Sequence, residues 1–212
     1  MCKVSITLLV HNASATLSRC IKSIVDQSYD DWELICCDDF SADDSLLILL
    51  EWAQRDKRIK VLYNKKHRGI PYTRNKCVKE ARGEYIAIID DDDYCATDRI
   101  KEQVQFMDQH KKYSFVGSKA YVFDEDGIWK TTSPKEMPEA KDFLFTACFL
   151  NPSVMIRRKD MENIGFYREI KETRRCEDYD LFMRMYTEGY MGYNMQVPLV
   201  YYYRGKKAYP KC

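Results

Sequence analysis

The sequence contains few of the patterns that usually mark a phosphate-binding loop or a metal cluster. None of its eight glycines forms the G-x-G-x-x-G or G-x-x-x-x-G-K-[ST] pattern, which argues against an ordinary dinucleotide-binding fold and a P-loop nucleotide hydrolase. Its three histidines are scattered at positions 11, 67 and 110, and no C-x-x-C pair occurs, which argues against a zinc site. If the chain binds phosphate, other groups must neutralise it.

Long apolar runs and a net charge are also missing. No segment approaches the roughly 20 apolar residues that a membrane-spanning helix needs, and the N-terminus enters a strand pattern at once, without the apolar core of a signal peptide. Lys and Arg (34) nearly balance Asp and Glu (33), so no global field favours nucleic acid or a membrane. Any electrostatic recognition must be local.

Cysteine is plentiful, but its pattern does not favour disulfides. The number, nine, is odd, and a chain of 212 residues is too long for a small disulfide-stapled domain. Several cysteines also lie in apolar runs, namely Cys20, Cys36, Cys37 and Cys148. We therefore expect reduced thiols and a soluble, cytoplasmic protein.

Short apolar strands alternate with amphipathic helices in the first half of the chain. Strands are expected at 4–10, 32–37, 59–63 and 85–89, each followed by a helical pattern. This alternation predicts a mostly parallel sheet flanked by helices, in which ligands gather at the carboxyl ends of the strands. Beyond residue 113 the pattern predicts a hairpin at 115–132, a helix at about 177–188 and a closing strand at 200–203. We expect one domain, 1–212, in two parts, 1–98 and 99–212.

Four consecutive aspartates, 90–93, follow the strand at 85–89. Carboxylates repel one another, so ending a buried strand with four of them is costly unless a cation or a donor-rich ligand neutralises the cluster. Oxygen ligands at a strand end suit Mg²⁺ or Mn²⁺, which commonly bridge to substrate phosphates. Alone, such a run is more often a solvated acidic turn, so the rest of the chain must decide.

Three other polar groups each have a structural and a functional interpretation. Of Asp38 and Asp39, one is expected to cap the next helix, which leaves the other free to accept from a ligand N–H such as the imide of uracil. Arg74, after the basic stretch 65–69, either faces solvent or contacts a diphosphate. Asp178, at the start of a helix, either complements the helix dipole or acts as a general base.

Taken in order, the motifs resemble those of family 2 glycosyltransferases. Each is weak alone, but together, in register, they identify the chain as a member of that family and cover nearly all of it. The matching segments are Val4 to Asn12, Gln27 to Ile35, Asp38 to Asp43, Arg74-Asn75, Gly83 to Ala87, Asp90 to Asp93, and Glu177 to Leu181.

The resemblance implies a nucleotide-diphospho-sugar transferase fold of the GT-A type, with a smaller mixed C-terminal acceptor part. It implies sugar transfer with inversion from a nucleotide-diphospho-sugar, with UDP favoured over dTDP or GDP, and a hexosyl or N-acetylhexosaminyl group as the sugar. Residues 1–98 would bind the donor. Residues 99–212 would bind a glycan or lipid-linked glycan acceptor of polysaccharide biosynthesis, which would bring the protein to the inner face of the cell membrane.

The resemblance also implies roles for single residues. Asp178 matches the catalytic base, and Asp92, in the DxD position, matches the direct ligand of Mn²⁺ or Mg²⁺. Asp39 matches the base-reading aspartate and Arg74 the donor-contacting arginine. The positions expected to bind the donor are Val10, Asn12, Asp39, Arg74, Asp90 and Asp91.

The chain departs from the family pattern at a few positions, and other functions remain open. Phe40 stands where glycine is usual, and His11 where tyrosine is common, while Asp93 is expected only to cap the turn towards the next helix. A nucleotide-sugar-binding partner without catalysis is one alternative function. A receiver-like signalling domain phosphorylated at Asp90 is another, but it leaves Arg74 and Asp178 unexplained. The basic end, from Arg204 to Lys207, stays solvated, closes over the diphosphate or touches anionic lipid.

Overall fold

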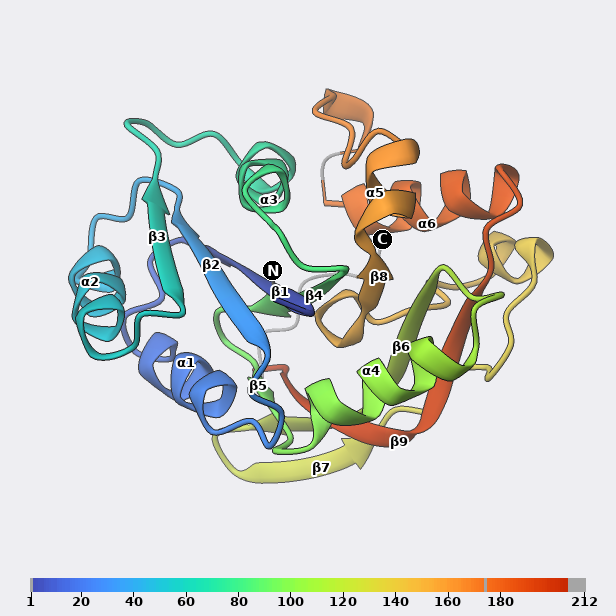
Figure 1. Ribbon diagram of the computed structural model, residues 1–212, viewed down its shortest axis with the longest axis horizontal. Helices are drawn as coiled ribbons and strands as arrows, with labels where there is room; N and C mark the ends of the chain where they lie inside the picture. Colours follow the sequence, from blue (N-terminus) through green and yellow to red (C-terminus); the bar gives the residue numbers. More distant parts are fainter. Residues whose placement is uncertain (1, 174, 206–212) are drawn as a thin grey trace.

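A computed structural model describes residues 2–173 and 175–205 of the chain (Figure 1). Its elements, in chain order, are β1 (Val4–Val10), α1 (Leu17–Val25), β2 (Trp32–Asp38), α2 (Ser45–Arg55), β3 (Ile59–Tyr63), α3 (Ile70–Lys79), β4 (Tyr85–Asp90), β5 (Tyr94–Cys95), α4 (Arg99–Gln109), β6 (Phe115–Asp124), β7 (Gly127–Thr131), η1 (Ala140–Leu144), η2 (Asn151–Ser153), β8 (Met155–Arg157), α5 (Arg158–Asn163), η3 (Lys171–Thr173), α6 (Glu177–Thr187) and β9 (Gly192–Tyr203).

The described strands form one mixed sheet in the order β3-β2-β1-β4-β8-β6-β9-β5, and β7 pairs with β6. Strands β3, β2, β1 and β4 are parallel, whereas β8 pairs antiparallel with β4 and with β6. In the parallel half, Leu9 lies opposite Asp90, and Val10 opposite Asp38. The carboxyl ends of β1, β2 and β4 therefore meet at one edge, as the alternation of strands and helices predicts.

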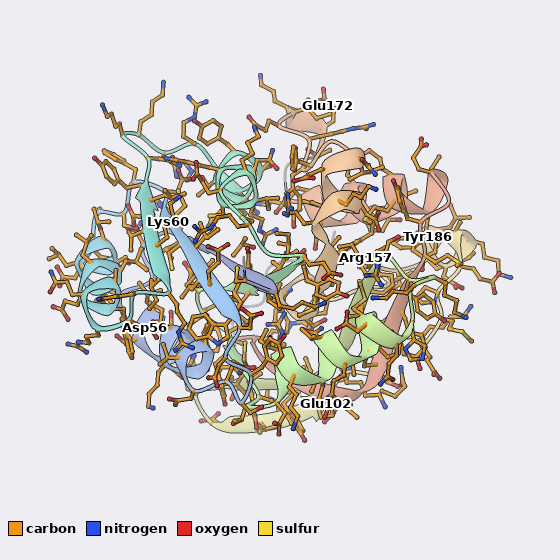
Figure 2. The ribbon with its side chains drawn as sticks, in the orientation of Figure 1. Asp56, Lys60, Glu102, Arg157, Glu172 and Tyr186 are labelled. Carbon is orange, nitrogen blue, oxygen red and sulfur yellow. The ribbon has the colours of Figure 1, made fainter. Side chains whose placement is uncertain are left out.

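Helices cover both faces of the sheet, which explains why its central strands are apolar along their whole length. Strands β1, β2 and β4 are buried at nearly every position. One core contains the inner sides of α1 and α4, and the other contains side chains of α3, α5 and α6 (Figure 1). Arg157, labelled in Figure 2, is the half-buried last residue of β8, and its guanidinium donates to the carbonyl oxygens of Met107 (2.7 Å) and Tyr113 (2.9 Å).

The second half differs from expectation mainly in its last strand. The expected strand at 200–203 is only the end of β9, which begins at Gly192 and pairs parallel with β6. Polar residues and Pro198 interrupt the apolar alternation there, and the β6–β9 register shifts around Lys119, where Pro198 lies opposite and cannot donate a hydrogen bond. The expected hairpin is β6–β7, and the expected helix is α6.

The described cysteines, eight in number, are all free thiols. Within the described ranges, no helix is long and apolar enough to cross a membrane.

Candidate active site

A cleft of about 1090 Å³ opens at the carboxyl ends of the parallel strands. One wall is the loop that leads into α3, and residues 169–171, 175 and 177 also border the cleft. The full lining comes from the ends of β1 and β2, the 66–72 segment, the aspartate run and these five residues: Leu9, His11, Asp39, Lys66, His67, Arg68, Gly69, Ile70, Pro71, Tyr72, Asp91, Glu169, Ile170, Lys171, Arg175 and Glu177.

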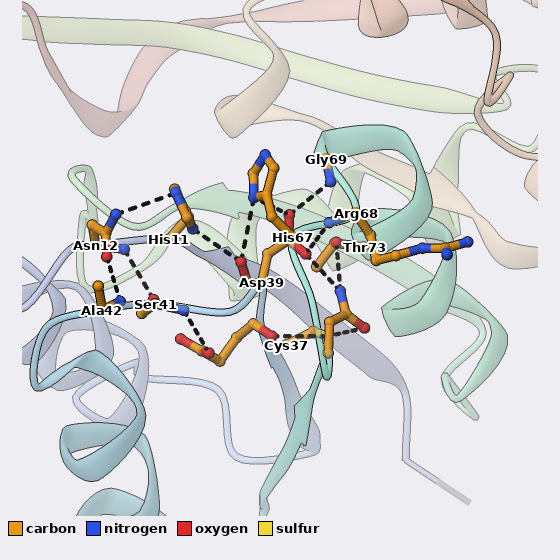
Figure 3. A network of polar contacts seen from close by, with 12 residues as sticks. His11, Asn12, Cys37, Asp39, Ser41, Ala42, His67, Arg68, Gly69 and Thr73 are labelled. Carbon is orange, nitrogen blue, oxygen red and sulfur yellow. Dashed lines mark hydrogen bonds and ion pairs between the residues drawn. The ribbon is translucent and has the colours of Figure 1, made fainter.

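Asp39 lies at the strand end of the cleft and is almost completely buried, with 1% of its surface exposed. Its Oδ1 accepts from Asn64 Nδ2 and from the backbone N–H of Arg68, both at 2.8 Å (Figure 3). Its Oδ2 accepts from the backbone N–H of Gly69 at 2.8 Å and lies 3.1 Å from His67 Nδ1. Burial alone would raise the pKa of Asp39, but these donors hold it below its usual value.

Val10 and Asn12 lie beside Asp39, as the sequence predicts. The carbonyl of Val10 accepts from the backbone N–H of Asp39 at 2.8 Å. Asn12 has a left-handed backbone (φ 54°), and its side chain and backbone N–H bond to the 41–42 loop (Figure 3). His11 Nδ1 lies 3.0 Å from the carbonyl oxygen of Asp39. These residues form one compact polar surface at the ends of β1 and β2.

Asp38 does not cap a helix, and neither does Asp39. Asp38 Oδ2 accepts from the backbone N–H of Ser41 at 3.0 Å and so closes the turn that contains Phe40. The N-cap position of α2 is Asp44. The expectation that one of the pair caps the next helix is therefore wrong, because the chain makes a further turn before α2 begins.

The first three aspartates of the run are close together at the end of β4. Asp90 Oδ1 accepts from Arg74 Nη2 at 2.7 Å, and Asp91 Oδ2 accepts from the backbone N–H of His11 at 3.0 Å. Burial, together with the charges of its neighbours, raises the pKa of Asp91 to about 7. Burial and the charge of Asp90 raise the pKa of Asp92 to about 6. A cation or a donor-rich ligand beside these two carboxyl groups would favour their ionised forms.

Asp93 has a different environment and is fully buried. Its Oδ1 accepts from the backbone N–H of Tyr203 at 2.7 Å, and its Oδ2 has no hydrogen-bond partner among the described residues. The N-cap position of α4 is Asp98. Asp93 therefore anchors the end of β9 beside the acidic cluster, and the expectation that it caps the turn is wrong.

Arg74 is not on a solvated face, since only 11% of its side chain is exposed. Besides Asp90, its guanidinium lies 3.4 Å from Glu177 Oε1. With the amide of Asn151 oriented so that its oxygen faces the guanidinium, that oxygen accepts from Arg74 at 2.9 and 3.0 Å. Burial works against the charge of Arg74, but Asp90, Glu177 and Asp178 raise its pKa. Arg74 thus links the end of β4 to the start of α6.

Asp178 lies half-buried in the first turn of α6, where its Oδ1 accepts from the backbone N–H of Tyr179 at 2.8 Å. Its neighbour Glu177 is buried, and Glu177 Oε2 has no hydrogen-bond partner among the described residues. Glu177 lines the cleft, whereas Asp178 is not among its lining residues. The charge of Asp178 nevertheless contributes to the raised pKa of Arg74.

Several residues of the site carry little signal in the sequence. Asn64 follows β3 directly and bonds to Asp39, so its place after a strand could have identified it. His67 belongs to the basic stretch but points at Asp39 (Figure 3). Asn151 has no local pattern, because only the fold brings η2 beside Arg74.

The acidic cluster fits a divalent cation only if a ligand completes the coordination. Within the described ranges, no group of three His, Cys, Asp or Glu side chains is placed to hold a metal by itself. Mg²⁺ and similar ions are commonly held by one or two carboxylates together with phosphate oxygens of a substrate. Asp91 and Asp92 suit that arrangement, because burial and neighbouring carboxylates raise the pKa of both and a bound cation would stabilise their ionised forms.

A comparison with protein families identifies the family to which the chain with these site residues belongs. The model described as Glycosyl transferase family 2 matches residues 5–180, which include every site residue discussed above except Tyr203. The chain belongs to glycosyltransferase family 2. The ordered motifs of the sequence indicate the same family. The region matched by the family model contains both the carboxylates at the strand ends and the start of α6.

Two related proteins carry names of this class. EpsE of Bacillus subtilis (strain 168), named as a glycosyltransferase, is 37% identical to this family 2 glycosyltransferase over 198 residues, covering 93% of this chain and 71% of EpsE. WfaP of Escherichia coli is 30% identical over 202 residues, covering 94% of this chain and 76% of WfaP. WfaP is named UDP-Glc:alpha-D-GlcNAc-diphosphoundecaprenol beta-1,3-glucosyltransferase.

Two solved structures share the fold of this family 2 glycosyltransferase. TarS of S. aureus, in complex with UDP, matches with a TM-score of 0.79 and 22% identity over 95% of this chain and 60% of the TarS chain. The mannosyltransferase PcManGT of Pyrobaculum calidifontis, in complex with GDP-Man and Mn²⁺, matches with a TM-score of 0.73 and 17% identity over 99% of this chain and 58% of its own. The chain thus spans about three fifths of these solved chains, and the predicted GT-A type fold is confirmed.

Proposed function

We propose that this protein is an inverting glycosyltransferase that moves a sugar from a UDP-sugar to a hydroxyl group of a glycan or lipid-linked glycan in polysaccharide biosynthesis. One observation carries the proposal. Asp39, Asp91 and Glu177 line one cleft at the carboxyl edge of the sheet, and Arg74 pairs with both Asp90 and Glu177, the residue directly before Asp178. Such an edge is where open α/β sheets bind their ligands.

The donor half of the proposal uses residues 1–98. Asp39 accepts from the imide N–H of the base, while the backbone around Val10 and Asn12 holds the nucleoside. Asp90 and Asp91 lie towards the ribose and donor sugar. Arg74, held by Asp90 and Glu177, contributes positive charge on the diphosphate side. The UDP in the TarS complex and the UDP-Glc in the name of WfaP support UDP over other nucleotides.

Asp92 is the proposed ligand of a divalent ion, Mn²⁺ or Mg²⁺. When bound, this ion supplies several kcal/mol of charge stabilisation to the departing diphosphate. The assignment is supported by the raised pKa of Asp92, which is caused first by burial and then by the charge of Asp90, because a cation beside Asp92 would stabilise its ionised form. The Mn²⁺ in the PcManGT complex is a further support.

Asp178 is the proposed general base. It takes the proton of the acceptor hydroxyl, whose oxygen attacks the anomeric carbon from the face opposite the diphosphate; the bond to the diphosphate breaks, and the configuration inverts. The start of α6 suits this role because Arg74 connects it to the donor side. Residues 99–212 then form the acceptor side, and an acceptor such as the lipid-linked glycan in the name of WfaP would bring the protein to the inner face of the cell membrane. Of the basic end, Lys206 and Lys207 lie outside the described residues.

A donor screen tests the proposal. UDP-, dTDP- and GDP-sugars are incubated with the protein and Mn²⁺, with and without a crude lipid-linked acceptor fraction, and nucleotide release is measured. We expect release from one or more UDP-sugars that increases when acceptor is added. If UDP-sugars bind but no sugar is released or transferred under any condition, the protein is a nucleotide-sugar-binding partner and the proposal is wrong.

A further inference from the structure

The carboxylate of Asp39 has no acceptor position left for a ligand unless a protein group moves. An ionised carboxylate offers about four lone-pair positions. In the structure three of these positions accept from Asn64 Nδ2 and from the backbone N–H groups of Arg68 and Gly69, and His67 Nδ1 lies 3.1 Å from Oδ2 on the remaining side (Figure 3). A nucleobase imide that donates to Asp39 must therefore displace one of these four groups.

Three of the donors are held firmly. Asn64 is buried, and its Nδ2 also donates to Thr73 Oγ1 at 2.9 Å, so it is fixed between β3 and α3. Arg68 and Gly69 donate from the backbone immediately before α3, and Gly69 holds its left-handed conformation (φ 86°) at the N-cap. Moving any of these groups would require a shift of the start of α3.

His67 is held much less firmly. Its side chain is 59% exposed. Besides its approach to Asp39 Oδ2, Nδ1 lies 3.4 Å from the carbonyl oxygen of Asp39, and the ring lies 4.6 Å from the ring of His11 between centroids. Rotation of one exposed side chain would free Oδ2 without disturbing the backbone. His67 is therefore the donor that a ligand can replace at the lowest cost.

We propose that His67 and the nucleobase compete for Oδ2 of Asp39, so that His67 sets the affinity for the donor nucleotide and its dependence on pH. This inference rests on the proposed role of Asp39 in binding a UDP-sugar. A hydrogen bond from a charged imidazolium to a carboxylate is stronger than one from a neutral imidazole. Protonated His67 therefore opposes nucleotide binding more than neutral His67 does.

Other charged groups face the same part of the cleft and must be separated from the effect of His67. They are Asp39 at the end of β2, His11 at the end of β1, Asp91 after β4, Lys66 and Arg68 on the same loop, and Glu169, Lys171, Arg175 and Glu177 across the cleft. Variants of His67 alone keep all of these groups in place, so the difference between each variant and the wild type isolates its contribution.

The experiment is a titration of UDP, with Mn²⁺ present, at pH 8 and pH 6, for the wild type, His67→Ala and His67→Gln. We expect His67→Ala to bind UDP about two- to tenfold more tightly than the wild type at pH 8, the range that one neutral hydrogen bond spans. The ratio should be larger at pH 6. His67→Gln keeps a neutral donor, so its affinity for UDP at pH 8 should lie between those of the wild type and His67→Ala. At pH 6 it should lack the additional loss of UDP affinity that the wild type shows.

His110→Ala is the matched control, since His110 packs against Phe106 on α4, on the other side of the sheet. It should bind UDP as the wild type does at both pH values. If His67→Ala binds UDP no more tightly, or more weakly, than the wild type, the competition does not exist.

Two further ligand-binding measurements separate this inference from the proposed function. Asp39→Asn should weaken UDP binding, and 3-methyl-UDP, which lacks the imide N–H, should bind the wild type more weakly than UDP. If both hold but His67→Ala shows no gain, only the inference about His67 fails. If UDP binds Asp39→Asn as well as the wild type, or does not bind the wild type at all, the role of Asp39 and the competition that depends on it are both wrong.

Discussion

Arg74 is the residue that connects the two sides of the candidate site. It is nearly buried, and it pairs with Asp90 from β4 and with Glu177 from α6, which are far apart in the sequence. A buried guanidinium between carboxylates is costly to unpair, because it would leave an uncompensated charge. Arg74 therefore fixes the distance between the donor-side aspartates and the start of α6.

Removal of the divalent ion should weaken donor binding through Asp92. We expect EDTA to lower UDP affinity and to abolish transfer in the wild type, since the charge of the diphosphate would then face the carboxylates directly. Asp92→Asn should bind UDP weakly even when Mn²⁺ is present, and EDTA should change its affinity for UDP little. Isothermal titration of UDP with and without Mn²⁺ measures both. Unchanged binding and transfer after EDTA treatment would show that no divalent ion is required.

Phe40 occupies a left-handed backbone conformation (φ 63°) with 56% of its side chain exposed. This left-handed conformation costs a residue with a Cβ roughly 1 kcal/mol of free energy, and it costs glycine much less. We expect Phe40→Gly to raise the free energy of unfolding by about 0.5–1 kcal/mol in urea denaturation. Phe40→Ala keeps the Cβ and serves as the control, so equal effects of the two variants would contradict the explanation.

Sequence reasoning reached the strand-end residues of the site but not their contacts. Asp39 and the aspartate run could be predicted because a polar residue directly after a buried strand has a fixed place at the sheet edge. The burial of Arg74 could not be predicted, because it depends on Asn151 and Glu177, which only the tertiary fold brings close to Arg74. For the same reason the sequence predicts only a turn role for Asp93, whereas in the structure its side chain anchors the end of β9.

At the scale of elements, the parallel half was the predictable part. Its strands are continuous apolar runs covered on both faces, and each is followed by a helix with one apolar side. The other half of the sheet combines parallel and antiparallel strand pairs whose partners are far apart in the sequence. Its strand β8 has only three residues. Short strands with irregular register leave little periodicity to detect.

At the amino end of the parallel strands, Glu33 of β2 ties β1 to the α3–β4 connection. It accepts from Ser5 Oγ at 2.7 Å and from the Arg82 backbone and guanidinium at 2.9 and 2.8 Å. Burial works against its charge, but these donors lower the pKa of Glu33 below its usual 4.5. A lowered pKa in the folded state means that ionised Glu33 stabilises the fold above pH 4.5 and that this stability is lost as the pH falls through the lower value.

We expect Glu33→Gln to lower the free energy of unfolding by about 1–3 kcal/mol at pH 7. The difference from the wild type should shrink as the pH falls below 4.5, because the wild-type carboxylate is then also neutralised. Urea denaturation between pH 7 and about pH 3 measures this. Glu51→Gln, which breaks an exposed pair with Arg55, is the control and should change little. A constant difference at every pH would contradict the role of the charge.

For the whole molecule, one continuous sheet carries both the proposed donor side and the proposed acceptor side. The pairing of β4 with β8 joins the parallel half to the mixed half, and the ion pairs of Arg74 span the same junction at the cleft. The site is therefore held by sheet hydrogen bonds on one side and by buried charges on the other. This arrangement allows groups from distant segments to keep fixed positions around one ligand.

The most direct test of the central claim compares sugar transfer by the wild type and by Asp178→Asn, using the UDP-sugar that the wild type turns over. We predict that Asp178→Asn transfers about a hundred- to ten-thousandfold more slowly, the usual contribution of a general base, while UDP affinity stays the same. Asp160→Asn changes the matching first-turn acid of α5, away from the cleft, and should transfer normally. Transfer by Asp178→Asn at the wild-type rate would contradict the account.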